Sequence, residues 1–203
     1  MRGLVLGAAV LALAACGSGT DSEPVDEAVA TPPPVPSDPA TDEATVTPTP
    51  EPTPDPVVML DGGSIAAGSE KLLFNAGRTE TDAALAKVLG DATGSSANDE
   101  CGAGPLEFTD FPGGFSVSYQ GGKLVGWLWR LPQDGDNGAN AEIKTSVGVS
   151  LGTPRATVEG KPGFEMFEES TLGDEYAIGS DLFGFFDKGE VSMLYAGTQC
   201  FFR

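Results

Sequence analysis

The sequence predicts an α+β domain over residues 57–203, preceded by a disordered linker. Two tandem repeats, about 72–131 and 143–203, are each expected to hold a helix followed by antiparallel strands. The strands of both repeats would form one sheet with the helices on one face. Three observations predict this fold: the composition changes after Pro56, a helical pattern opens each repeat, and a strand–turn–strand pattern occurs twice.

The first fifteen residues have the features of an export signal. Arg2 supplies a positive charge, and the apolar run over residues 4–15 is too short to span a bilayer as a helix. The run ends in Leu13-Ala14-Ala15-Cys16, which resembles the lipobox of bacterial lipoproteins. This resemblance implies cleavage after residue 15 and attachment of a diacylglyceryl group to the thiol of Cys16.

The lipobox resemblance also implies where the protein resides. The new amine of Cys16 can take a further acyl chain, and two or three chains, at about 0.8 kcal/mol per buried CH₂, make membrane attachment lasting. We therefore expect an extracytoplasmic protein, anchored by lipid to the outer face of the bacterial cell membrane. The alternative is an ordinary secretory signal with a cysteine at this position by chance.

Residues 16–56 are predicted to carry the lipidated cysteine and a disordered tether. Between Gly17 and Pro56 the chain has eleven of its sixteen prolines and nine acidic residues, but no Lys, Arg or aromatic residue. Such a segment buries too little apolar surface to offset its ordering entropy. Prolines and like charges extend it, so it can reach on the order of 100 Å when stretched.

The charge and residue content of the domain exclude several function classes. Residues 57–203 have 21 acidic and 10 basic residues, and this negative field opposes nucleic acid as a partner. The chain has no histidine, which removes the Ser-His-Asp triad and histidine metal ligands. We expect no metal, no cofactor and no catalysis. A cell-wall hydrolase that uses two carboxylates is the enzymatic alternative.

Two cysteines remain once Cys16 is set aside for lipidation. Cys101 and Cys200 make the even number that is typical of one disulfide in an oxidising compartment. Closing a loop of about 100 residues would stabilise the fold by about 4–5 kcal/mol on the chain-entropy model. Two free buried thiols are the alternative.

The first repeat is expected to begin with a helix and to continue with three strands. Thr79 or Thr81 can cap the helix, and Gly90 can end it. The pair Gly121-Gly122 is a strong hairpin signal. The predicted elements are a helix over 79–90, a loop over 91–104, and strands around 106–109, 115–120 and 123–131.

The second repeat has the same order with a shorter helix. Pro154 suits the first turn of a helix that ends near Gly160. Lys188-Gly189 is the predicted turn between the last two strands. The predicted elements are a loop over 131–141, the short helix, an extended region over 163–170, and strands near 181–186 and 190–196.

The two hairpins align with each other in register, residues 115–124 with residues 182–191. This order is similar to the tandem helix-and-three-strand architecture of the β-lactamase inhibitory protein family. It is also similar to the single-repeat outer-membrane assembly lipoproteins related to that family. The resemblance covers about residues 77–203 and implies a curved sheet whose open face binds a protein.

Strand parity predicts which residues lie on that open face. A two-residue turn at 121–122 pairs Tyr119 with Leu124 and Phe115 with Leu128, and paired residues share a face. Counted this way, both hairpins place large apolar side chains on the face away from the helices. The candidate partner-binding residues are Trp127, Trp129, Phe183, Phe185 and Leu194.

An apolar patch of this kind predicts a binding module for an envelope or extracellular protein, or for an apolar ligand. Three alternatives remain open. Segments of the chain itself, such as residues 57–65, would cover the patch; a bulge would reverse the parity; or the protein is a structural envelope lipoprotein with no dedicated ligand.

Overall fold

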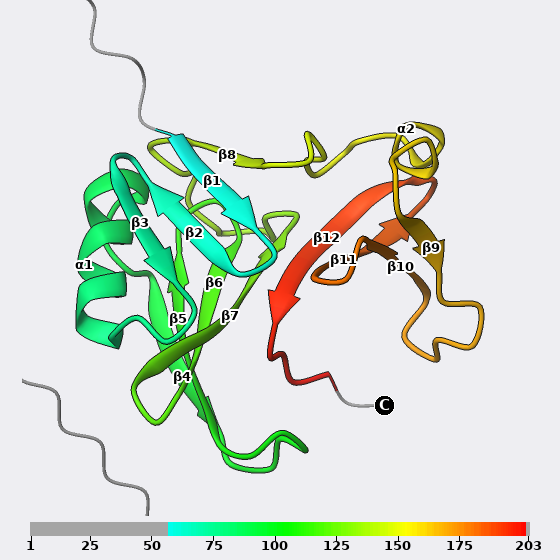
Figure 1. Cartoon of the computed structure of the whole chain (residues 1–203). Coiled ribbons are helices and arrows are strands. Elements are labelled where there is room, and N and C mark those ends of the chain that lie inside the picture. The colour runs from blue at the N-terminus through cyan, green and yellow to red at the C-terminus, as the bar shows by residue number, and fades with distance from the viewer. Residues whose placement is uncertain (1–56, 202–203) are drawn as a thin grey trace, which may run out of the picture. The chain divides into compact units, whose positions relative to one another are not determined.

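The computed structural model describes residues 57–201 (Figure 1). The predicted signal, the lipidation site Cys16 and the tether lie outside the described residues. The described part is an α+β domain dominated by strands, as the sequence predicts. Its elements are β1 (Val57–Asp61), β2 (Ser64–Ala67), β3 (Glu70–Leu73), α1 (Arg78–Leu89), β4 (Gly94–Asn98), β5 (Leu106–Phe111), β6 (Phe115–Gln120), β7 (Lys123–Arg130), β8 (Glu142–Thr145), α2 (Arg155–Glu159), β9 (Phe164–Met166), β10 (Asp174–Ile178), β11 (Leu182–Asp187) and β12 (Glu190–Gly197).

The strands form two sheets, whereas a single sheet was predicted. The large sheet has the order β4-β5-β6-β7-β12-β11-β10-β9, and all its neighbours are antiparallel. Strands β7 and β12 pair at its centre. The small sheet has the order β3-β2-β1-β8, in which β1 and β8 are parallel. The sequence prediction missed β1–β3 because it assigned no element before the first helix.

The small sheet and α1 pack on one face of the large sheet and enclose the core. Buried residues alternate along β1, where Val58 and Leu60 are fully buried and Met59 between them is exposed. This period of two directs one row of side chains towards the large sheet. From α1, Leu85 and Leu89 enter the same cluster.

The first hairpin corrects the predicted strand parity. Its turn has two residues, as predicted, and positive φ at Gly121 (57°) and Gly122 (74°) matches a type I′ turn. The pairing then shifts, because Tyr119 faces Leu124 whereas the preceding Ser118 faces Gly126. Val125 is thus an extra residue in β7, and a bulge of one residue moves every later side chain to the opposite face.

Trp127 and Trp129 therefore lie in the core, and their predicted exposure is wrong. Trp127 is 0% exposed and Trp129 is 8% exposed. The indole Nε1–H of Trp127 donates a 2.8 Å hydrogen bond to the backbone oxygen of Asp61 at the end of β1. The N-terminal hairpin thus covers this indole, as one of the alternatives predicted.

The second hairpin also has a bulge, and it corrects the placement of Leu194. Phe186 faces Val191 and Phe185 faces Met193, so Ser192 is the extra residue in β12. Leu194 joins the buried face and is 0% exposed. Phe183 and Phe185 precede the bulge, and they stay on the face away from the core as predicted.

Candidate functional site

A row of aromatic rings lies on the outward face of β11 and β12, opposite the core. We call it the aromatic row. Each ring contacts the next, in the order Phe167, Phe183, Tyr195, Phe185 and Phe201. Phe183 stacks on Tyr195 with centroids 5.2 Å apart, and Phe185 lies 5.8 Å from the same ring. The rest of the chain extends the row at both ends, with Phe167 6.2 Å from Phe183 and Phe201 5.7 Å from Phe185.

The pairing of β11 with β12 explains why these rings meet. Phe183 is paired with Tyr195, and directly paired side chains stand on the same face. Phe183 and Phe185 are half-buried, whereas Tyr195 is 8% exposed because neighbouring rings surround it. Of the five residues predicted on this face, only Phe183 and Phe185 lie there. Trp127, Trp129 and Leu194 lie in the core, and the other rings of the row come from Phe167, Tyr195 and Phe201.

A pocket of about 760 Å³ opens at the Phe183 end of the row. Its walls include the rings of Phe167, Phe183 and Tyr195. Glu175 of β10 also lines it and is 2% exposed. The hydroxyl of Tyr195 donates a 2.6 Å hydrogen bond to Oε1 of Glu175. The hydroxyl of Ser170 donates to Oε2 of the same carboxylate, so this buried acid is held in place by two hydroxyls.

The pocket has an acidic character. Glu168 and Glu169 on the loop after β9 line it together with Glu175, and they are exposed. Among the described residues, none of those that line it is Lys or Arg. Glu168 and Glu169 are solvated, whereas Glu175 is buried. Only the pairing of β10 with β11 brings Glu175 beside the rings.

A second pocket, of about 360 Å³, lies at the Phe185 end of the row. Phe185 and Phe201 line it together with Met193 and Leu172. No charged side chain other than Asp174 and Asp187 appears among the described residues that line it. The row thus connects an acidic aromatic pocket with a more apolar one.

Cys101 and Cys200 lie together, as a disulfide requires, but both are free thiols in this structure. Cys101 is buried and Cys200 is half-buried. A hydrogen bond with the Cys101 side chain, and secondly burial, raise the pKa of the Cys200 thiol above its usual value. Phe201 follows directly after Cys200, so this contact fixes the segment that completes the aromatic row.

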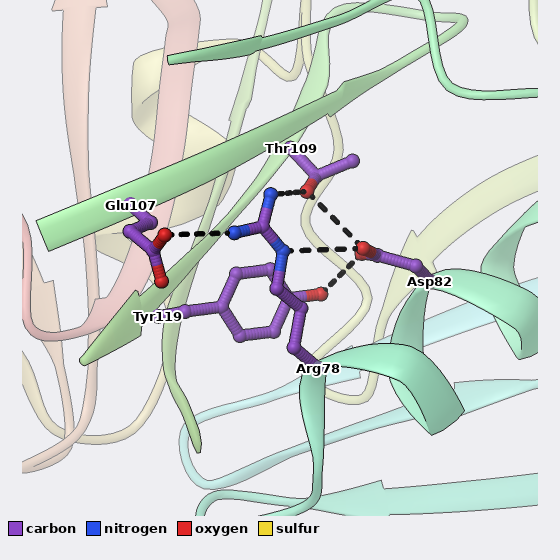
Figure 2. Close-up of polar contacts among 5 residues, drawn as sticks. All are labelled: Arg78, Asp82, Glu107, Thr109 and Tyr119. Carbon is purple, nitrogen blue, oxygen red and sulfur yellow. Dashed lines mark hydrogen bonds and ion pairs between the residues drawn. The ribbon is translucent and has the colours of Figure 1, made fainter. Parts of the chain in front are cut away.

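A polar cluster between α1 and the large sheet also brings charged groups together (Figure 2). Arg78 contacts Asp82 at 3.5 Å and Glu107 at 3.1 Å, and its guanidinium lies 5.2 Å from the ring centroid of Tyr119. The Tyr119 hydroxyl donates a 2.5 Å hydrogen bond to Asp82, and Thr109 donates to the same carboxylate at 3.3 Å.

The residues of this cluster form hydrogen bonds and ion pairs with one another. We therefore interpret the cluster as a structural contact that holds α1 against the large sheet. Burial, and secondly the hydrogen bond to Asp82, raise the pKa of Tyr119 far above its usual range. The phenol therefore stays protonated and keeps its hydrogen bond at any ordinary pH.

Comparisons of this chain with protein-family models, with curated proteins and with solved structures find no match. Within residues 57–201, neither helix has the length and apolar character needed to cross a membrane. In the same part of the chain, no three side chains of the His, Cys, Asp or Glu type gather as metal ligands would.

Proposed function

We propose that this chain is a non-catalytic binding module, anchored by lipid to the outer face of the bacterial cell membrane, which engages an envelope protein through the aromatic row. One observation carries the proposal. One face of the large sheet packs against the core. On its other face lie five aromatic rings in contact with one another, and two pockets. Aromatic side chains contribute most of the energy at protein interfaces, and such a patch on a monomer is usually functional.

The expected N-terminal features fit this role. The lipobox-like residues up to Cys16 would attach the chain to the membrane, and the proline-rich tether would hold the domain at a distance from it. We further propose that Cys101 and Cys200 form a disulfide outside the cell. Their contact, across almost one hundred residues of sequence, supports this pairing.

We also propose that the two halves of the large sheet are tandem repeats. Helix α1 precedes β4–β7 and helix α2 precedes β9–β12, and the two sets are antiparallel at the centre. Each helix is bridged at its start to the last strand of its set, Gly77 to Lys123 and Pro154 to Glu190. Val158 of α2 belongs to the same core cluster as Leu85 of α1, which supports helices on one face.

Site-specific photo-crosslinking in intact cells tests the proposed function. Benzoylphenylalanine at position 183 is expected to give an adduct with a discrete envelope protein. The matched control places the same group at Leu73, which is 57% exposed on β3 of the small sheet. No adduct from position 183, or the same adducts from both positions, would contradict binding through the aromatic row.

A further inference from the structure

We infer that the pocket at the Phe183 end of the aromatic row takes the lysine or arginine side chain of an extended segment of the partner protein. This inference rests on the proposed function and adds the chemistry of the partner. It follows from the aromatic walls, the charges of the pocket and the continuation of the row beyond it.

The walls of the pocket suit a cation. Phe167 stacks on Phe183 and Phe183 stacks on Tyr195, so three ring systems border the same space. The face of an aromatic ring carries negative electrostatic potential and attracts ammonium and guanidinium groups within about 6 Å of the ring centre. Elsewhere in this fold, Arg78 lies over Tyr119 and Arg155 over Phe186, each at 5.2 Å.

Among the described residues that line the pocket, all the charged side chains are acidic. Glu168 and Glu169 lie at its exposed side, and Glu175 is buried within it. Arg155 is committed to Glu159 at 2.7 Å and to Asp174 at 3.1 Å. An anionic group would meet repulsion here. A purely apolar segment would take the exposed carboxylates of Glu168 and Glu169 out of water, which costs free energy.

The shape of the row favours a peptide segment over a small free amine. Beyond Tyr195 the rings continue through Phe185 to Phe201, where the second pocket has Met193 and Leu172 in its lining. A basic side chain in the first pocket and an apolar side chain against the second would use the whole row. The net charge of −19 on the chain would also steer a basic segment towards it.

Peptide titration of the full-length protein tests this inference. The probes are three hexapeptides: Lys-Gly-Leu-Lys-Gly-Leu and two counterparts with Glu or Gln in place of Lys. Isothermal titration calorimetry measures the affinity of each peptide at low and at physiological ionic strength. The lysine peptide is expected to bind more tightly than the glutamine peptide, and the glutamate peptide is expected not to bind. Added salt should weaken the binding of the lysine peptide.

Two sets of variants locate the effect. Glu168→Gln/Glu169→Gln is expected to weaken binding of the lysine peptide about tenfold, from the loss of two attractive charges near the site. The matched control Asp99→Asn/Glu100→Gln removes two adjacent exposed carboxylates from the loop after β4, and binding should be unchanged. Phe183→Leu keeps the wall apolar and should weaken binding about two- to fivefold through loss of the cation–π contact.

The outcomes separate this inference from the proposed function. Equal loss of binding in the variants at 168/169 and 99/100 would show attraction by net charge alone and would overturn the cationic pocket. Equal affinity for the lysine and glutamine peptides would overturn it as well. In both cases an adduct from position 183 in cells would leave the proposed function standing, whereas its absence would remove both.

Discussion

In each half of the large sheet a helix precedes antiparallel strands that end in a hairpin, but the outward faces of the two halves differ. At the start of each helix, the backbone N–H of Arg78 donates to Gly122 and that of Arg155 donates to Gly189, at 3.0 and 2.9 Å. Each final hairpin turns over two residues with positive φ, and each last strand has one extra residue, Val125 or Ser192.

The difference lies in the outward side chains of the two halves. With the hairpins aligned at their turns, the rings of Phe183, Phe185 and Tyr195 correspond to Ser116, Ser118 and Leu128. Ser118 donates to the backbone oxygen of Thr198 at 2.8 Å and so serves the fold. The backbone of each half thus creates an outward face, and the side chains on that face differ between the halves.

The helices also differ between the halves, and here the first half has the larger element. Helix α1 has 12 residues and is fastened to the sheet by the cluster around Tyr119 (Figure 2), whereas α2 has 5 residues. The ring that corresponds to Tyr119 in the second half is Phe186, which has no hydroxyl and lies under Arg155. The first half therefore has the longer helix, with a polar attachment to the sheet (Figure 2), and the second half has the candidate binding surface.

Removing a ring from the core should have the largest effect on the free energy of unfolding, and should lower it more than removing a ring from the outward face. Trp127→Ala should lower the free energy of unfolding by about 3–5 kcal/mol, because it empties a fully buried site between the sheets. Phe183→Ala, on the half-buried outward face, should cost clearly less. Urea unfolding of both variants measures the difference. A small effect of Trp127→Ala would contradict the placement of this indole in the core.

The proposed disulfide should have the next largest effect, since it ties the loop after β4 in one half to the segment after β12 in the other. Cys101→Ser/Cys200→Ser should lower the free energy of unfolding of the oxidised protein by about 2–4 kcal/mol. With reductant present the wild type should lose most of this advantage. Free-thiol titration of secreted protein provides a direct control, and two reactive thiols in the unfolded chain would contradict the disulfide.

Two buried tyrosines, one in each half, give a sharper comparison. The Tyr119 hydroxyl is bonded to Asp82, whereas the Tyr176 hydroxyl has no hydrogen-bond partner among the described residues. Tyr119→Phe should destabilise the fold by about 1.5–3 kcal/mol because the hydrogen bond goes to a charged acceptor. Tyr176→Phe should be neutral or slightly stabilising. Equal losses in the two variants would contradict this assignment.

The smallest effect concerns alkaline pH. Burial raises the pKa of Tyr176, and burial together with the bond to Asp82 raises the pKa of Tyr119. Both phenols ionise more readily in the unfolded chain, so their contribution to stability is complete below pH 10 and falls as the pH rises above it. Urea unfolding from pH 8 to 11 should show this fall, and it should be less steep in Tyr119→Phe. A constant stability above pH 10 would contradict it.

Local sequence signals predicted the parts of the fold that depend on neighbouring residues. The turns at 121–122 and 188–189, and the helix that ends at Gly90, follow from residue types that favour those backbone conformations. The same signals missed β1–β3, β8 and β10, and they assigned β4 (Gly94–Asn98) to a loop over 91–104, whereas it pairs with β5. Short strands such as Glu142–Thr145 have little pattern of their own and form because a distant partner strand supplies their hydrogen bonds.

The candidate site was predicted only in part, for the same reason. Phe183 and Phe185 alternate with buried residues on one strand, so their shared face could be read from the sequence. Glu175 and Phe167 enter the site from other elements, and Phe201 arrives from the segment after β12. Those neighbours depend on strand order and on the contact between Cys101 and Cys200, which no local pattern encodes.

The α+β class and the positions of the two hairpin turns could be predicted from composition and adjacent residues, and the export signal and the acidic tether are predictions from the same kind of pattern. Tertiary structure alone decided which rings are buried. One extra residue in β7 and one in β12 reverse the faces of Trp127 and Leu194, and the β1–β2 hairpin then seals the first of them. Bulges are decided by the packing energy of the assembled sheets, in which a large indole gains more from the core than from water.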